Sequence, residues 1–207
     1  MCVFSIHRPE LETIFQKQQC IYAGFDPTAE GLHFGNLLIL MSLLHFLRDG
    51  HQVVCLVGNG TARIGDPSDK AGERPALCEE AIQRNSAAVS ANISKIFSNH
   101  YKYIWLSSQK RHPKPSQIFE PIILHNLDWY RNRNVIDFIS TVGRKLRLSD
   151  MLSRKFVADR VKSKEGLSFT EFSYQVFQGY DWFHLFNQYN CKFQVREFSD
   201  FKINKKF

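Results

Sequence analysis

Apolar and polar segments alternate through the first part of the chain. Residues 20–25 (CIYAGF) form a short apolar run that ends in the turn residues DPT, which predicts a strand and then a turn. Residues 34–48 are apolar on nearly every side, which predicts a buried helix with Gly50 in the C-terminal capping position. Residues 52–58 (QVVCLVG) are continuously apolar and β-branched, as in a strand covered on both faces. This order predicts a parallel, right-handed crossover unit.

The remainder of the chain also separates into elements. Residues 8–18 and 78–97 have the composition of helices, and the second of these has a polar face. Residues 106–120 form a Pro-rich surface connector. Residues 121–126 (PIILHN) predict another buried strand, and residues 127–146 begin a further helical stretch. The length of 207 residues fits one domain, or one domain and a fragment.

The last clear helix spans residues 169–188. Ser168 and Glu171 have the S-x-x-E spacing of a capping box at its start. Three later residues share one polar face of this helix: Tyr174, Gln178 and Asp181. An aspartate among so many aromatic residues must reach water or find a partner. A solvent-facing stripe is the commoner meaning of such a pattern, and a binding face is the alternative.

Composition indicates a folded protein with a basic surface. The chain is 43% hydrophobic and 14% aromatic, which is enough to fill a core. Its net charge is +7, with a sequence pI near 9.2. Residues 143–166 alone carry eight Arg or Lys against three Asp or Glu. Such a charge fits a phosphate-rich partner such as nucleic acid, or simply a solvated basic surface.

The cysteines indicate the redox state of the compartment, and the lengths of the apolar runs bear on whether the chain spans a membrane. The five cysteines include no close pair, so we expect free thiols in a reducing compartment, without a zinc site or a disulfide framework. No apolar run reaches the roughly 20 residues that span a bilayer. The N-terminus resembles neither a signal peptide nor a clear organelle transit sequence.

Two loops follow the predicted strands and would lie at the carboxyl edge of the sheet, where ligands bind. In residues 26–36 (DPTAEGLHFGN), a histidine, a glycine and an asparagine stand at the start of the apolar helix. Exposed amides there favour phosphate, and the alternative is a capped helix whose histidine points to solvent. Residues 58–70 (GNGTARIGDPSDK) form a backbone-lined concavity for an anion, or an ordinary turn.

Four segments, in this order, together resemble the tyrosyl-tRNA synthetases, a family of class I aminoacyl-tRNA synthetases. They are YAGFDPTAEGLHFGN (22–36), LVGNGTARIGDPSDKAGER (56–74), HNLDWY (125–130) and TEFSYQVFQGYD (170–181). The resemblance runs from about residue 21 to residue 194 and is strongest to the mitochondrial branch. It implies an α/β fold, with a Rossmann-type parallel sheet and flanking helices, in a protein that forms a homodimer.

The resemblance also implies a domain organisation. Residues 1–194 would be the class I catalytic domain, and within it an insert at about 127–190 would form the dimer interface. Residues 195–207 form a divergent tail. The family continues with a GGSDQ loop, a KMSKS loop and an anticodon-binding domain, so the resemblance implies a catalytic domain that is incomplete at its C-terminus. We therefore expect the chain as written to be inactive in charging tRNA.

The same resemblance implies roles for particular residues. HFGN stands where the family has its HIGH signature, so His33 and Asn36 would be catalytic and would hydrogen-bond ATP and its α-phosphate. The implied ATP-binding residues are Gly24, Asp26, His33, Gly35 and Asn36. Tyr22 and Asp181 would bind the phenolic hydroxyl of substrate tyrosine. The implied residues that hold its ammonium group or line its pocket are Asp26, Thr61, Asn126, Tyr174 and Gln178.

Three further positions, Asp66, Lys70 and Arg74, would shape the pocket and the ATP side less directly. Two residues depart from the family pattern: Asn59 and Asp69 each replace a usual glycine.

The function implied by the resemblance is tyrosine–tRNA ligase activity, in which tyrosine is activated with ATP and transferred to tRNA(Tyr). ATP would be a substrate accompanied by Mg²⁺, without a metal bound by the protein itself. The implied location is the mitochondrial matrix, with the cytoplasm as the alternative. Other readings of the residues are a truncated isoform or gene fragment that only binds tyrosine or dimerises, another HxGH-type nucleotidyltransferase, and a basic RNA-binding module.

Overall fold

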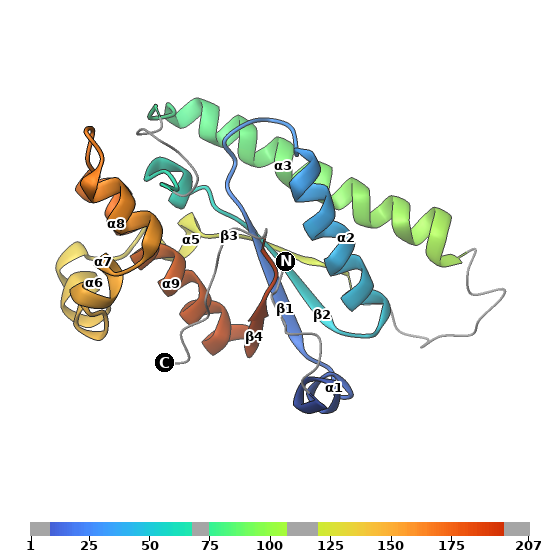
Figure 1. Ribbon diagram of the computed structural model, residues 1–207. Coiled ribbons are helices and arrows are strands. Elements are labelled where there is room, and N and C mark those ends of the chain that lie inside the picture. Colours follow the sequence, from blue (N-terminus) through green and yellow to red (C-terminus); the bar gives the residue numbers. More distant parts are fainter. Residues whose placement is uncertain (1–8, 68–74, 107–119, 197–207) are drawn as a thin grey trace.

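A parallel β-sheet forms the centre of the protein in the computed structural model (Figure 1). The structure describes residues 9–67, 75–106 and 120–196. In these ranges the sheet has four strands in the order β3-β2-β1-β4, and every neighbouring pair is parallel. The strands are β1 (Cys20–Phe25), β2 (Gln52–Val57), β3 (Ile122–His125) and β4 (Cys191–Gln194). The predicted strand–helix–strand unit is therefore confirmed at β1 and β2.

Helices connect the strands on both faces of the sheet. They are α1 (Pro9–Phe15), α2 (Phe34–Arg48), η1 (Thr61–Arg63), α3 (Glu79–Asn99), the π-helical η2 (His100–Trp105), α5 (Leu127–Tyr130), α6 (Val135–Thr141), η3 (Gly143–Lys145), α7 (Leu148–Leu152), α8 (Lys155–Lys162) and α9 (Phe169–Tyr189). The α2 crossover joins β1 to β2 and α3 begins the crossover to β3, whereas the connection from β3 to β4 passes through α5 to α9. The long last crossover carries the basic residues 143–166.

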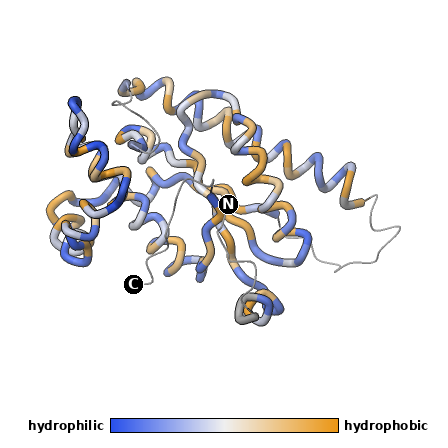
Figure 2. Tube along the Cα trace, viewed as in Figure 1, coloured by the Kyte–Doolittle hydropathy of each residue, from blue (hydrophilic) through white to orange (hydrophobic). Residues whose placement is uncertain are grey.

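The alternation of side chains along β1 explains why both faces of the sheet are covered. Ile21, Ala23 and Phe25 point to one face and belong to a core cluster with α2 and α3. Cys20 and Tyr22 point to the other face and pack with residues of α9. Figure 1 shows α2 and α3 on one side of the sheet and α9 on the other. Because both faces of β2 are covered, it is apolar and buried from Val53 to Val57. Figure 2 shows hydrophobic residues alternating with hydrophilic ones along α3, which covers one of these faces.

Two predictions about burial were wrong. Helix α2 is buried on one face only, since Phe34 is 74% exposed and Leu38 and Met41 are also exposed. Its apolar outer face lies outside the core of the described chain. Strand β3 is only partly buried, because it lies at the edge of the described sheet.

The ends of α9 are fixed by local sequence. The amide of Glu171 donates to Ser168 Oγ at 3.2 Å, and the amide of Ser168 donates to Glu171 Oε2 at 3.3 Å, which confirms the predicted capping box. At the other end Asn190 adopts a left-handed conformation with φ of 50°, and the chain turns directly into β4. These two ends set which part of α9 lies over the sheet.

A buried ion pair joins α8 to α9. Arg160 donates to Glu171 Oε2 at 2.9 Å and to the carbonyl oxygen of Gly166 at 3.1 Å. The two charged side chains are only 8% and 3% exposed. One prediction for residues 143–166 was a basic surface exposed to solvent. Arg160 differs from that prediction, because its side chain is buried. The pair holds the capping glutamate in place and so positions the start of α9.

We predict that Arg160→Met lowers the free energy of unfolding by about 3 kcal/mol, because it leaves the Glu171 carboxylate buried without its counter-ion. The matched control is Arg84→Met, which breaks the exposed pair of Arg84 with Glu30, whose side chains are 64% and 60% exposed. That change should cost well under about 1 kcal/mol. Urea unfolding followed by circular dichroism measures both. Equal losses in the two variants would show that burial does not set the value of the Arg160 pair.

Candidate active site

The candidate site lies where three parallel strands end and the middle of α9 crosses them. Asp26 follows β1, Thr61 lies in the turn after β2, and Asn126 follows β3. Tyr174 and Asp181 reach the same place from α9. The carboxyl edge of the sheet therefore collects polar groups from segments far apart in the sequence, as expected for this class of fold.

Asp26 is held from two sides. Thr61 Oγ1 donates to Asp26 Oδ1 at 2.7 Å, and the hydroxyl of Tyr174 donates to Asp26 Oδ2 at 2.7 Å. The backbone at Gly58 approaches this pair so closely that a Cβ atom there would overlap both Asp26 Oδ1 and Thr61 Oγ1. The glycine that ends β2 is thus required for the close approach of the two loops.

Asn126 connects the two halves of the site. It is fully buried, and its Nδ2 donates to Thr61 Oγ1 at 3.0 Å and to Asp181 Oδ2 at 2.9 Å. Its Oδ1 accepts from the amide of Gly60 at 2.7 Å. All three contacts agree on one orientation of the side-chain amide, so Asn126 relays a fixed geometry from the β2 turn to α9.

Asp181 is a buried carboxylate, 4% exposed, that accepts three side-chain hydrogen bonds. Besides Asn126, Trp129 Nε1 donates to Oδ1 at 2.9 Å and the Tyr130 hydroxyl donates to the same oxygen at 2.6 Å. Burial raises the pKa of Asp181 to about 7, although the hydrogen bonds from Tyr130, Asn126 and Trp129 act in the opposite direction. Asp181 therefore faces the protein interior, and the solvent-facing alternative is wrong for this residue.

Trp129 and Tyr130 are site residues that the sequence reasoning missed. Both belong to the HNLDWY segment (125–130), where only Asn126 was assigned a role. A tryptophan and a tyrosine beside each other indicate apolar packing first, and only the fold shows that their polar ends meet one carboxylate. The available signal was the buried aspartate itself, which requires donors from other elements.

Tyr22 reaches the site from the buried face of β1. It is 2% exposed, and burial followed by the negative charge of Asp181 raises its pKa well above the ordinary value. Its ring lies 6.4 Å from that of Trp182. The negative charge of Asp181 acts on the Tyr22 hydroxyl, so the two side chains lie in the same part of the site.

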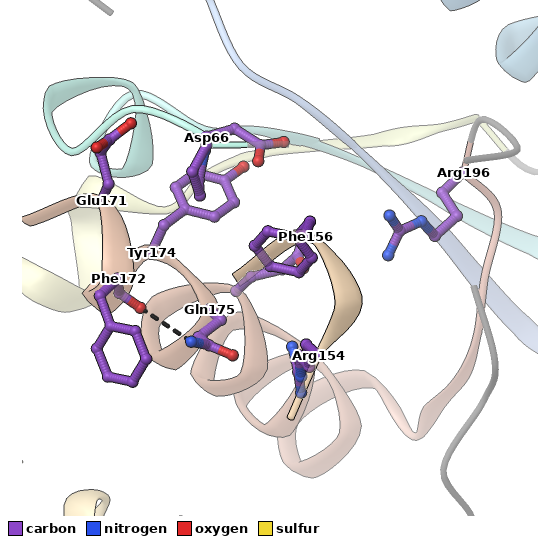
Figure 3. A pocket seen from close by; sticks show the side chains of 10 residues that line it. Asp66, Arg154, Phe156, Glu171, Phe172, Tyr174, Gln175 and Arg196 are labelled. Carbon is purple, nitrogen blue, oxygen red and sulfur yellow. Dashed lines mark hydrogen bonds between the residues drawn. The ribbon is translucent and has the colours of Figure 1, made fainter. Parts of the chain in front are cut away.

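The far side of Tyr174 borders a small cavity of about 20 Å³ (Figure 3). Asp66 and Gln178 line it together with Tyr174, and burial and the charges of Asp26 and Asp66 raise the pKa of Tyr174. Arg154 also lines the cavity, and burial, with the positive charge of Arg196, lowers its pKa. Gln178 and Asp66 thus both lie at the cavity beside Tyr174.

The N-terminus of α2 is capped by a capping box, in which His33 and Asn36 each accept a hydrogen bond from the backbone amide of the other. The amide of Asn36 donates to His33 Nδ1 at 3.3 Å, and the amide of His33 donates to Asn36 Oδ1 at 3.2 Å. The sequence left open whether these residues bind phosphate or cap the helix, and the structure shows that they cap it. The cap uses one polar atom of each side chain, and His33 Nε2 and Asn36 Nδ2 take no part in it. Gly24 and Gly35 lie on either side of this loop, and the space around Gly24 is open.

Of the remaining positions named from the sequence, the structure describes Asn59 but not the three that follow residue 67. Asn59 Oδ1 accepts from the amide of Leu127 at 3.0 Å, so this departure from the family pattern ties the β2 turn to α5. Asp69, Lys70 and Arg74 lie outside the described residues, as do residues 197–207 of the tail.

Among the described residues, no three His, Cys, Asp or Glu side chains gather as metal ligands. No helix in the described ranges is long and apolar enough to cross a membrane.

We predict that Asp181 makes stability fall as pH rises. Its folded pKa of about 7 lies above the ordinary value of 3.8, so the folded state holds a proton that the unfolded state has lost. The associated stability is complete below about pH 4 and is lost as pH rises through 7. Asp181→Asn should reduce the slope of unfolding free energy against pH between 4 and 7, by up to about 1.4 kcal/mol per pH unit. Urea titrations at several pH values measure the slope, with the exposed Asp150→Asn as control. An unchanged slope in Asp181→Asn would contradict the assignment.

Comparison with known proteins places this geometry in a family. The family model for class I tRNA synthetases (W and Y) matches residues 16–194. The mitochondrial tyrosine–tRNA ligase of Drosophila melanogaster is 45% identical over 188 residues, which are 90% of this chain and 40% of that protein. The tyrosine–tRNA ligase of Protochlamydia amoebophila is 46% identical over 175 residues, 84% of this chain and 38% of that protein. The chain thus spans about 40% of the length of these curated relatives.

A solved structure supports the same assignment. The C-terminally truncated mitochondrial tyrosyl-tRNA synthetase of Aspergillus nidulans matches with a TM-score of 0.80 and 28% identity, over 91% of this chain and 51% of that one. The predicted α/β fold with a Rossmann-type parallel sheet is confirmed. Because the family model covers most of the chain and the polar network occupies the carboxyl edge of the sheet, the chain belongs to the class I tRNA synthetases, in the tryptophan and tyrosine branch.

Proposed function

We propose that this chain provides the amino-acid pocket of a tyrosine–tRNA ligase, which activates tyrosine with ATP and transfers it to tRNA(Tyr). The observation that carries the proposal is Asp181, a buried carboxylate beside Tyr22 at the carboxyl edge of the sheet. A buried charge is costly unless it is paired or hydrogen-bonded. A pocket that buries a carboxyl group next to the Tyr22 hydroxyl suits a ligand that carries a hydroxyl of its own.

The phenolic end of tyrosine would meet Asp181 and Tyr22. Its hydroxyl would donate to the carboxylate, and the Tyr22 hydroxyl would contact the phenolic oxygen. Phenylalanine would bring only a ring edge to the same place and leave the carboxylate without that donor. Tryptophan, the other amino acid of this branch, carries an indole N–H at a different distance from its backbone, so the direct carboxylate–hydroxyl pairing favours tyrosine.

The ammonium end of tyrosine would lie by the small cavity. Asp66, Tyr174 and Gln178 meet there, and Tyr174 also bonds Asp26. Carboxylate, hydroxyl and amide oxygens are suitable acceptors for an ammonium group. Thr61 and Asn126 would line the pocket and hold its walls at a fixed distance through their hydrogen bonds.

ATP would bind at the mouth of α2. His33 and Asn36 would present Nε2 and Nδ2 to the phosphates, while Gly24 and Gly35 let the nucleotide approach the backbone, and Asp26 lies at the boundary with the tyrosine pocket. The helix N-terminus adds a favourable field for the α-phosphate. Mg²⁺ would enter with ATP. The carboxylate of tyrosine is already a nucleophile, so these residues act by positioning and charge stabilisation.

The proposed assembly is a homodimer. Apolar side chains in the last crossover remain exposed, among them Val135, Ile136, Leu148 and Phe169. Exposed apolar side chains, where they form one patch, are typical of subunit interfaces. The proposed location is the mitochondrial matrix, which is supported by the names of relatives such as the Drosophila and human mitochondrial ligases. A domain that only binds tyrosine or dimerises is the second candidate, and the exposed apolar side chains of the last crossover favour the dimer.

We predict that the chain binds tyrosine about 100-fold more tightly than phenylalanine, because phenylalanine would leave one buried acceptor position of Asp181 without a donor. Asp181→Ala should bring the two affinities to within about tenfold of each other. The contrasting variant is Asp66→Asn, which should weaken both amino acids equally, since both carry the ammonium group. Isothermal titration calorimetry measures all the affinities. Equal binding of both amino acids by the unchanged chain would refute the assignment of the phenol site.

We predict that the two roles of His33 can be separated. His33→Ala removes the cap of α2 and should cost about 1 kcal/mol of stability, whereas His33→Asn keeps a capping acceptor. Both variants lack Nε2, so wherever the unchanged chain catalyses ATP–pyrophosphate exchange above background, both should slow that exchange by roughly 100-fold. In that case, exchange by His33→Asn at the rate of the unchanged chain would exclude a role for Nε2. Exchange at background in the unchanged chain, with tyrosine binding intact, would favour the domain that only binds.

A further inference from the structure

The carboxylate of Asp181 has a limited number of acceptor positions, and the protein fills most of them. A carboxylate offers about four lone-pair directions, two on each oxygen. Oδ1 accepts from both Trp129 and Tyr130, so its two directions are used. Oδ2 accepts from Asn126. With respect to residues 9–67, 75–106 and 120–196, one direction on Oδ2 therefore remains for a further donor.

The Tyr130 hydroxyl has a single proton and two acceptors within reach, of which Asp181 is the nearer. The hydroxyl lies 2.6 Å from Asp181 Oδ1 and also 2.9 Å from the carbonyl oxygen of Phe177, one turn earlier in α9. The Tyr130 ring is packed edge-on against Phe177 and Phe138, with centroids 5.2 and 6.1 Å away. Burial and the charge of Asp181 raise the pKa of Tyr130, so its hydroxyl stays protonated and remains a donor. The ring contacts would persist if only the hydroxyl were removed.

Other charged and titratable groups face Asp181 from the elements packed against it. Tyr22 approaches from β1 and Asp26 from the loop after it, and the charge of Asp26 disfavours the ionised form of Asp181. On α9 itself, His184 stacks on Trp129 with centroids 4.3 Å apart, and burial and then Arg133 lower the pKa of His184. None of these groups donates a hydrogen bond to the carboxylate. The three donors from Asn126, Trp129 and Tyr130 therefore oppose burial in keeping Asp181 ionised.

We propose that Tyr130 is a specificity-determining positioning residue, which favours the ionised form of Asp181 and directs its one open acceptor position, on Oδ2, to the hydroxyl of the bound amino acid. This inference rests on the proposed tyrosine site. Without the Tyr130 hydroxyl, Oδ1 regains an open position and the carboxylate can rotate or take up a proton. The ligand hydroxyl would then meet a neutral acid at neutral pH, and a neutral hydrogen bond is about half as strong as a charge-assisted one.

The test is Tyr130→Phe, which removes the hydroxyl and keeps the ring. The matched control is Tyr103→Phe, which removes a hydroxyl from an exposed side chain on η2. Calorimetry from pH 6 to pH 8.5 gives the ratio of tyrosine to phenylalanine affinity, in which changes at the shared ammonium group cancel. Carbon-13 NMR of the aspartate carboxyl groups follows the protonation of Asp181 without ligand.

We expect Tyr130→Phe to reduce the affinity ratio about tenfold at pH 7, and to recover most of it at pH 8.5 as Asp181 ionises. The titration midpoint of Asp181 should rise in the same variant, while Tyr103→Phe matches the unchanged chain in both measurements. A ratio that Tyr130→Phe leaves unchanged, or lowers equally at every pH, would overturn the inference. If the unchanged chain does not bind tyrosine, the proposed function fails. A raised Asp181 midpoint in that case supports the electrostatic half of the inference, and an unmoved midpoint overturns it.

Discussion

The removal of a carboxylate from water is the constraint on which the site depends. Asp181 lies in the interior between α9 and the sheet, where an isolated charge would be strongly destabilising. The protein offsets this cost with donors on two other segments, Asn126 after β3 and the Trp129–Tyr130 pair on α5. Each donor must arrive at the correct angle, so the end of β3, the short helix after it and the rotation of α9 are fixed together.

The parallel sheet makes this convergence possible. Strands that run in one direction place all their following loops at one edge, so Asp26, Thr61 and Asn126 become neighbours although they are far apart along the chain. Gly58 allows two of these loops to approach closely, and the buried pair of Arg160 with Glu171 fixes where α9 begins. Residues distant from the pocket thus contribute to its geometry without contact with a ligand.

Much of this arrangement could be predicted from sequence, for physical reasons that differ between elements. Short-range rules identified α2, β1, β2 and the capping box of Ser168, because caps and strands covered on both faces leave local patterns. The same rules overstated the burial of α2, since an apolar sequence does not reveal which neighbours are present. The roles of Trp129 and Tyr130 could not be predicted, because their hydrogen bonds to α9 depend on tertiary packing rather than on spacing.

The distances along the sequence between the bonded partners have a consequence for folding. Tyr174 and Asp26 are 148 residues apart, and Asn126 and Asp181 are 55 apart, so both contacts close long loops of chain. Loop closure on this scale is typical of contacts that form after the local helices and hairpins of a protein. The pocket should therefore be among the last parts of the domain to assemble. A ligand that binds it would act as a pharmacological chaperone, drawing the chain toward the native state by mass action and protecting newly made protein from degradation.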